Sequence, residues 1–179
     1  MVLLVLDYCS QLWSPSKVRE IQQIEEIQKN FTRKIRSNRR DDDLNWRKTY
    51  HLYSEQTRRE RYRIIYVRKI LARLVPNLAG RSELHAKTSL RFGRICSLPL
   101  RSTSASSGLQ MGSFDVNGPQ LLNSLPPHLQ NMTGIETLEF KKELDKFLLT
   151  VADEPLSPGY TAGRRAASNS LLHMIPACS

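Results

Sequence analysis

One run of carboxylates could take part in two-metal phosphoryl chemistry. Such chemistry needs acidic side chains that hold two divalent ions a few ångströms apart. The chain has one run of three consecutive acidic residues, Asp41 to Asp43, in a polar stretch directly after several arginines and without flanking apolar strands. Charge runs of this kind usually lie in water. We interpret the run as a solvated turn or an ion-pair partner of those arginines, and a metal site is the lesser alternative.

Histidine and cysteine are poorly placed for metal binding or nucleophilic catalysis. No two cysteines stand at the short spacing that a tetrahedral zinc site favours, and every histidine is isolated in the sequence. The odd, scattered set of cysteines favours reduced thiols and an intracellular setting over a disulfide framework. We therefore expect no catalytic residue, no metal and no cofactor. The residues considered are His51, His85, His128, His173, Cys9, Cys96 and Cys178.

The middle of the chain has a pattern that suits a polyanionic partner. Residues 31–75 hold 14 Lys and Arg against 5 Asp and Glu, in a chain of net charge +10. A helix is expected over residues 54–75, begun by Ser54 as its cap. At 100° per residue its cations other than Arg63 share one side with two tyrosines, opposite an apolar side made by Ile64, Val67, Ile70, Leu71 and Leu74.

This basic side predicts contact with nucleic acid, because cations can follow phosphates while tyrosine rings stack on bases. The alternative is an amphipathic helix whose charged side simply faces water. Arg63 falls in the apolar arc, where its long stem could reach out to water. The predicted RNA- or DNA-binding residues are Arg58, Arg59, Arg61, Tyr62, Tyr66, Arg68, Lys69 and Arg73.

Two further helices are expected on either side of this one. Ser14-Pro15 is typical of a helix start, and apolar residues from Val18 to Ile35 recur at steps of three and four, so that face needs a packing partner. Near the other end, Thr133 and Glu136 form a capping-box pattern before an apolar stripe from Phe140 to Val151. The stretch Leu121 to Leu125 predicts one or two helical turns between two proline-containing breaks.

We therefore expect a mainly α fold, a small bundle of three to four helices. A weak β pattern near 90–100 allows a short strand, and residues 101–108 have the composition of a disordered linker. No membrane span is expected. The expected organisation is a helix end at 1–13, a helical region at 14–80, a basic linker at 81–112, a C-terminal helical region at 113–152 and a disordered tail at 153–179.

Two motifs carry a family resemblance. They are Leu6-Asp7-Tyr8-Cys9-Ser10-Gln11-Leu12-Trp13-Ser14-Pro15 and Phe114-Asp115-Val116-Asn117-Gly118-Pro119-Gln120-Leu121-Leu122-Asn123-Ser124-Leu125-Pro126. In type and order they resemble motifs that follow the polymerase palm in jockey-like non-LTR (LINE-type) retrotransposon reverse transcriptases. The segments 54–75 and 137–149 are also similar to helices of that family. Leu122 departs from the family pattern, which usually has tryptophan there.

The resemblance implies the thumb and connection region of an RNA-directed DNA polymerase, after the palm. The family's x-Asp-Asp polymerase motif and its endonuclease lie upstream of this region, so no catalytic residue carries over and residues 1–13 would end a helix from the palm side. We expect a fragment that grips the RNA or DNA backbone without polymerase activity of its own, in the nucleus or the cytoplasm. The missing palm would be a partner. The alternatives are a helical protein-interaction or structural module, and a non-functional relic of a mobile element.

Overall fold

Every regular element in the described part of the chain is a helix. The computed structural model describes residues 8, 10, 15, 18–35, 52–72, 74–75, 114–130, 132, 136–153 and 170–175. The helices are α2 (Val18–Ile35), α4 (Glu55–Leu71), α6 (Phe114–Ser124), α7 (Pro127–Gln130), α8 (Thr137–Leu148) and α9 (Leu171–Met174). The mainly α prediction is confirmed, while the strand proposed near 90–100 lies outside the described residues.

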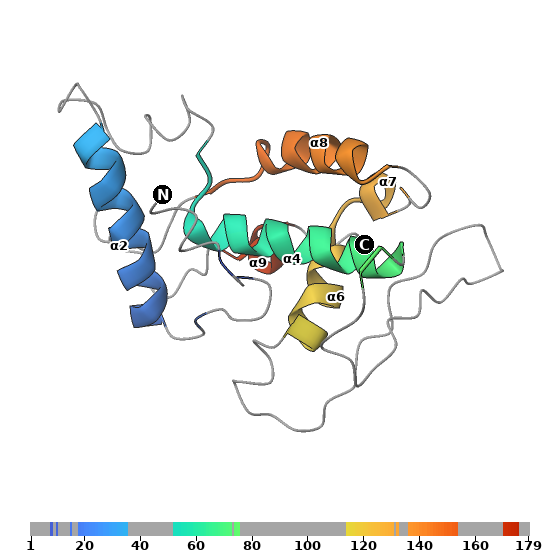
Figure 1. Ribbon diagram of the computed structural model, residues 1–179, viewed down its shortest axis with the longest axis horizontal. Helices are drawn as coiled ribbons and strands as arrows, with labels where there is room; N and C mark the ends of the chain where they lie inside the picture. The colour runs from blue at the N-terminus through green and yellow to red at the C-terminus, as the bar shows by residue number, and fades with distance from the viewer. Residues whose placement is uncertain are drawn as a thin grey trace.

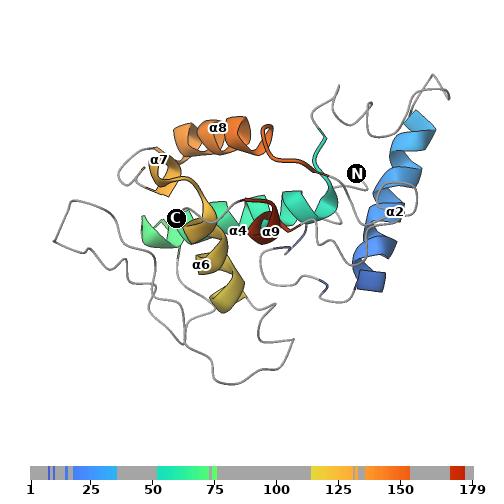
Figure 2. The same ribbon diagram turned by 180° about the vertical axis from the view of Figure 1, so that it is seen from behind.

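Helix α4 occupies the centre of this arrangement. Figures 1 and 2 show α8 alongside it, α6 crossing it, the short α9 against it and α2 near its N-terminal end. The buried apolar side chains come from all of these helices except α2. They include Ile64, Val67, Phe114, Leu121, Leu125, Leu129, Phe140, Leu144, Leu148, Leu171 and Ile175. A core built around one helix leaves that helix little surface for solvent.

The N-terminus of α4 is capped as predicted. The Ser54 hydroxyl accepts a hydrogen bond from the backbone N–H of Thr57 at 3.1 Å. Asp153, from the segment after α8, accepts from the Ser54 backbone N–H at 2.7 Å and from the Thr57 hydroxyl at 2.8 Å. The bonds from the Ser54 and Thr57 backbone N–H groups satisfy donors that have no intrahelical partner at the start of a helix. The helix ends at Leu71, four residues before the predicted end at Val75.

Helix α6 extends through a sequence that the turn pattern marked as a break. It begins at Phe114 and includes Gly118 and Pro119, so the predicted stop there is wrong. Close packing explains the glycine, because a Cβ built at Gly118 would lie 2.8 Å from Cγ2 of Val67 on α4. The second family motif therefore contributes a long stretch of the core and a close contact between α6 and α4.

Helix α8 keeps the predicted stripe but not the predicted start. Phe140, Leu144 and Leu148 are buried, as their spacing indicates. The helix begins at Thr137 with Glu136 in the cap position and without a side-chain capping bond, so Glu136 is not the fourth member of a capping box. The prediction placed that glutamate one turn inside the helix, where it could have reached back.

Part of the segment assigned to a disordered tail belongs to the core. Asp153 caps α4, and residues 170–175 form a turn of helix whose Leu171 is 1% exposed and Ile175 8% exposed. The tail prediction is wrong for these residues, since apolar anchors one helical turn apart find a complementary face on the bundle. The other residues of 153–179 lie outside the described part.

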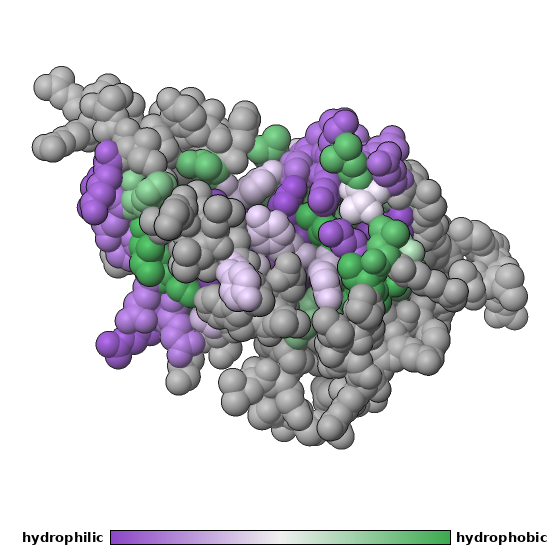
Figure 3. Space-filling model, viewed as in Figure 1, coloured by the Kyte–Doolittle hydropathy of each residue, from purple (hydrophilic) through white to green (hydrophobic). Residues whose placement is uncertain are grey.

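Helix α2 packs through a polar side. Glu25, Gln28 and Thr32 are buried, whereas Ile27 on the predicted packing face is 46% exposed. The Glu25 carboxylate accepts from the Gln56 backbone N–H at 3.1 Å, and the Gln28 amide donates to the Tyr53 carbonyl at 3.1 Å. A carboxylate is favourable beside a helix N-terminus, so capping α4 fixes the rotation of α2. Figure 3 shows hydrophobic side chains left at the surface over α2.

None of the described helices combines the length and apolar character needed to cross a bilayer.

Candidate nucleic-acid interface

The basic residues of α4 do not share one exposed face. Arg59 is 3% exposed, Arg63 3% and Arg68 6%, so these three guanidinium groups are enclosed by neighbouring elements. The expectation of a single solvent-facing basic side is therefore wrong. These arginines are buried because other helices pack around most of α4. Their long aliphatic stems fill space between the helices. Arg73 lies outside the described residues.

Buried arginines of α4 use other helices as partners. The Arg63 guanidinium donates to Oδ1 of Asn117 on α6 at 2.8 Å, so its stem does not carry the charge to water as predicted. Burial lowers the pKa of Arg63, partly offset by the carboxylate of Glu60. The Arg68 guanidinium lies 5.5 Å from the Phe140 ring centroid on α8, and burial lowers its pKa as well. Arg63 and Arg68 act as packing groups between helices.

Two other arginines of α4 are in ion pairs. Arg58 lies 3.0 Å from Glu55 on the same helix. Arg61 makes a two-pronged contact with Asp145 of α8, in which Nη2 donates to Oδ2 at 2.7 Å. The hydrogen bond to Asp145 raises the pKa of Arg61. Arg61 thereby joins α4 to α8, and the Asp145 carboxylate largely neutralises its charge.

A hollow of about 250 Å³ lies next to this bridge, between α4 and α8. It is lined by Arg61, Tyr62, Ile65, Tyr66, Lys69 and Lys141, and we call it the α4–α8 hollow. Its volume approaches the lower end of small-molecule sites, roughly 300 Å³. Of the eight predicted binding residues, the structure thus brings together Arg61, Tyr62, Tyr66 and Lys69.

The aromatic rings of the hollow are held by neighbours. The Tyr66 ring meets Phe114 of α6 edge to face, with centroids 5.4 Å apart and planes at 75°. The Arg61 guanidinium lies 5.8 Å from the centroid of the Tyr62 ring. Both tyrosines are half-buried. Rings already fixed by such contacts lose little conformational freedom when a planar group binds.

Two lysines supply the available positive charge. Within the described part of the chain, neither Lys69 nor Lys141 is in an ion pair, unlike Lys146, which lies 2.6 Å from Glu143. Lys141 was not among the predicted residues, because no sequence pattern places α8 beside α4. Its only sequence signal was its position next to Phe140 of the apolar stripe, on the flank of that helix. Figure 3 shows hydrophilic side chains gathered over α8.

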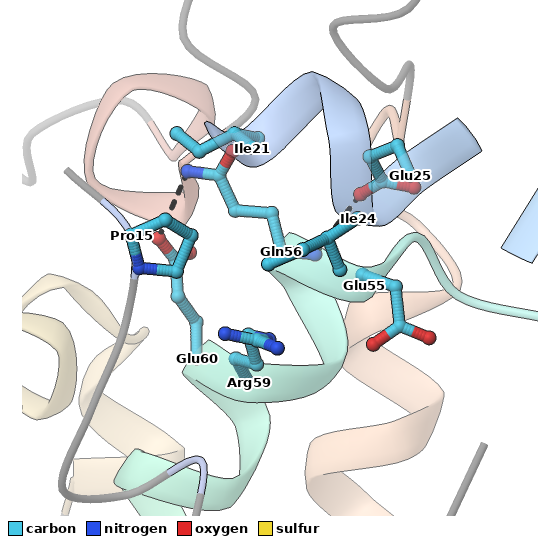
Figure 4. A pocket seen from close by; sticks show the side chains of 8 residues that line it. All are labelled: Pro15, Ile21, Ile24, Glu25, Glu55, Gln56, Arg59 and Glu60. Carbon is cyan, nitrogen blue, oxygen red and sulfur yellow. Dashed lines mark hydrogen bonds between the residues drawn. The ribbon is translucent and has the colours of Figure 1, made fainter. Parts of the chain in front are cut away.

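A second hollow, between α2 and the start of α4, is too small for a ligand. Figure 4 shows its lining side chains, Pro15, Ile21, Ile24, Glu25, Glu55, Gln56, Arg59 and Glu60. Its space of about 30 Å³ is of the size of one water molecule. Burial raises the pKa of Glu60 there, although hydrogen bonds from Leu171, Ser170 and Gln56 oppose the shift. We regard this hollow as a polar junction between helices.

The carboxylate run Asp41 to Asp43 lies outside the described residues. Among those described, no group of three or more histidine, cysteine or acidic side chains is arranged to hold a metal ion. The chain matches no protein-family model, no curated protein and no solved structure.

Proposed function

We propose that the chain is a non-catalytic fragment of a non-LTR retrotransposon reverse transcriptase that binds single-stranded RNA or DNA through the α4–α8 hollow. The observation that carries the proposal is the meeting of two tyrosine rings with Lys69 and Lys141 in one hollow. The family assignment is supported by the two sequence motifs. Four side chains of the second motif, Phe114, Leu121, Leu122 and Leu125, are buried in the core, as a folding element requires.

The side chains of the hollow suit an unpaired nucleotide. A base can stack on an aromatic ring irrespective of its identity, and ammonium groups can hold the flanking phosphates as point charges. The base pairs of a duplex are stacked on each other, so their faces are not available to Tyr62 or Tyr66. Contacts of this kind predict binding with little sequence preference. Arg61 contributes less than its charge suggests, since it is bound to Asp145.

The interface proposed here is smaller than the one predicted from sequence. Arg59 and Arg68 are buried, and Arg58 is paired with Glu55. In the folded chain we therefore assign the backbone contacts of this surface to Lys69 and Lys141.

Replacing both Lys69 and Lys141 by alanine is expected to weaken binding to a single-stranded oligonucleotide and to reduce its salt dependence. Each phosphate neutralised contributes about 0.7 to the slope of log affinity against log salt for single strands. The double variant should therefore lose roughly 1.4 from that slope. Fluorescence anisotropy with a labelled mixed-sequence 12-mer, titrated at several salt concentrations, measures both quantities.

Lys142→Ala provides a matched control, because Lys142 is exposed on the same helix but does not line the hollow. It changes the net charge without removing a proposed contact. If Lys142→Ala weakens binding as much as Lys141→Ala does, affinity follows overall charge and the α4–α8 hollow is not the site. A competing duplex of equal length should bind more weakly than the single strand.

A protein-interaction role is the second candidate, and the exposed flank of α2 favours it. Ile27 is 46% exposed, beside the half-buried Ile24 and Phe31. Exposed apolar patches promote association. Ile27→Glu is expected to lower any concentration-dependent mass measured by light scattering while leaving the thermal unfolding midpoint unchanged. A chain that is monomeric at all concentrations would count against this role.

A further inference from the structure

The short helix α9 packs on the bundle through buried apolar side chains. Its apolar anchors, Leu171 and Ile175, stand one helical turn apart, and both enter the core. Most of the packing is against α6, and Figure 2 shows α9 lying over α4 beside α6. In sequence, 16 residues separate Asp153 from Ser170, the residue that caps α9. The face of α4 and α6 that receives α9 is called its docking face below.

A polar contact marks the start of α9. Oε2 of Glu60, a side chain of α4 that is 6% exposed, accepts a hydrogen bond from the Leu171 backbone N–H at 2.7 Å. The Ser170 hydroxyl accepts from the Leu172 backbone N–H at 3.4 Å. An acceptor of this kind fixes where a helix begins and which way it runs. The docking face therefore combines apolar contacts with hydrogen bonds that the Glu60 carboxylate accepts from Leu171 and Ser170.

The conformation of α9 must come from its docking face. A single helical turn does not form by itself in water, because nucleation costs more than one turn returns. Short helices that lay apolar anchors into a complementary face are a recurrent mode of peptide recognition. The anchors here follow the i, i+4 spacing of that mode.

We propose that the α4–α6 docking face is a peptide-binding site for a Ser-Leu-Leu-x-x-Ile segment, occupied in the same chain by residues 170–175, and that it binds this segment equally when a second copy of the chain supplies it. The covalent link gives the chain's own segment a high effective concentration. A segment from another chain therefore competes only when the resident one is disabled or displaced.

The proposal is tested with a fluorescent peptide that copies residues 168–177. The hosts are the full wild-type chain and the full chain carrying Leu171→Asp and Ile175→Asp. Fluorescence anisotropy should show binding to the double variant at least about tenfold tighter than to the wild type, because the resident competitor has been removed. A peptide that itself carries Leu171→Asp is the control and should bind neither host.

Hydrogen exchange on the wild-type chain decides the case in which the double variant fails to fold. If residues 170–175 dock reversibly, their amides should exchange at least about a hundredfold faster than those of residues 140–148, since local opening precedes global unfolding. Equal rates in the two segments would overturn the proposal, as would a folded double variant that does not bind the peptide. Variants of the α4–α8 hollow leave this assay unchanged, so it is independent of the proposed nucleic-acid binding.

Discussion

Gly118→Ala is expected to lower the free energy of unfolding by about 1–3 kcal/mol, the usual cost of overpacking a core. In most helices the same change is stabilising by roughly 1 kcal/mol. Here the new Cβ would lie 2.8 Å from Cγ2 of Val67 and 3.2 Å from Cε2 of Phe114. Val67 is fully buried, and its branched side chain has little rotamer freedom to move away. Urea unfolding followed by circular dichroism measures the effect.

Val67→Ala tests the steric explanation directly, because it removes the methyl group that the new Cβ would meet. Val67→Ala alone should destabilise the core. Adding Gly118→Ala to it should cost little or should recover stability, which gives a favourable coupling energy in the double-mutant cycle. Additive costs would show that the close approach of α4 and α6 is not the reason for glycine. A Gly118→Ala variant as stable as the wild type would contradict the close packing of α4 against α6 at this position.

The local elements could be predicted from the sequence because their signals are local. The apolar stripe of α8 and the Ser54 cap of α4 are patterns within a few residues, and the structure confirms both. Helix boundaries were less accurate. Gly118 and Pro119 are breakers in a local reading, yet the tertiary contact with Val67 favours a helix through them.

The surroundings of α4 could not be predicted in the same way. A helical wheel divides one helix into sides, but it does not tell how many neighbours that helix has. Arg59 and Arg63 lie one turn apart on α4 and Arg68 lies on another side, yet all three are buried, because other helices pack around α4. Their partners Asn117 and Phe140 are more than 50 residues away along the chain, where no spacing rule applies.

The candidate site was therefore half predictable. Tyr62, Tyr66 and Lys69 follow one another at steps of four and three residues on one helix, so their grouping follows from helical geometry. Two other side chains come from α8. They are Lys141 and Asp145, whose carboxylate is paired with Arg61. Whether a cation is available to a phosphate depends on such partners, which only the packing of the two helices determines.

Arg63→Ala is expected to have the largest effect, a loss of about 2–5 kcal/mol at neutral pH, as for other large buried side chains that are shortened to alanine. The variant leaves Oδ1 of Asn117 without this donor and removes a positive charge near the buried carboxylate of Glu60. The loss should grow with pH. Equilibrium urea unfolding at a series of pH values measures it.

The sign of that pH dependence follows from the pKa of Glu60. Burial already raises this pKa above its ordinary value of 4.5, and the positive charge of Arg63 opposes the rise. A folded chain with a raised Glu60 pKa binds that proton more tightly than the unfolded chain, so the contribution of Glu60 to stability is greatest below pH 4.5 and is lost as the pH rises through the folded pKa. Arg63→Ala raises the pKa of Glu60 in the folded chain further. The pH range over which stability is lost therefore becomes wider, and the loss within it becomes larger.

Glu60→Gln provides the matched control, since it keeps the shape and removes the charge. Its amide oxygen can still accept from the Leu171 N–H, and its amide group can donate to Oε1 of Gln56, which has no partner in the described part of the chain. The Gln56 amide must turn over to allow this. In the Glu60→Gln background, Arg63→Ala should therefore cost less and should lose the pH dependence attributed to Glu60. An equal cost at every pH in both backgrounds would show that Arg63 acts through Asn117 alone, with no electrostatic contribution from Glu60.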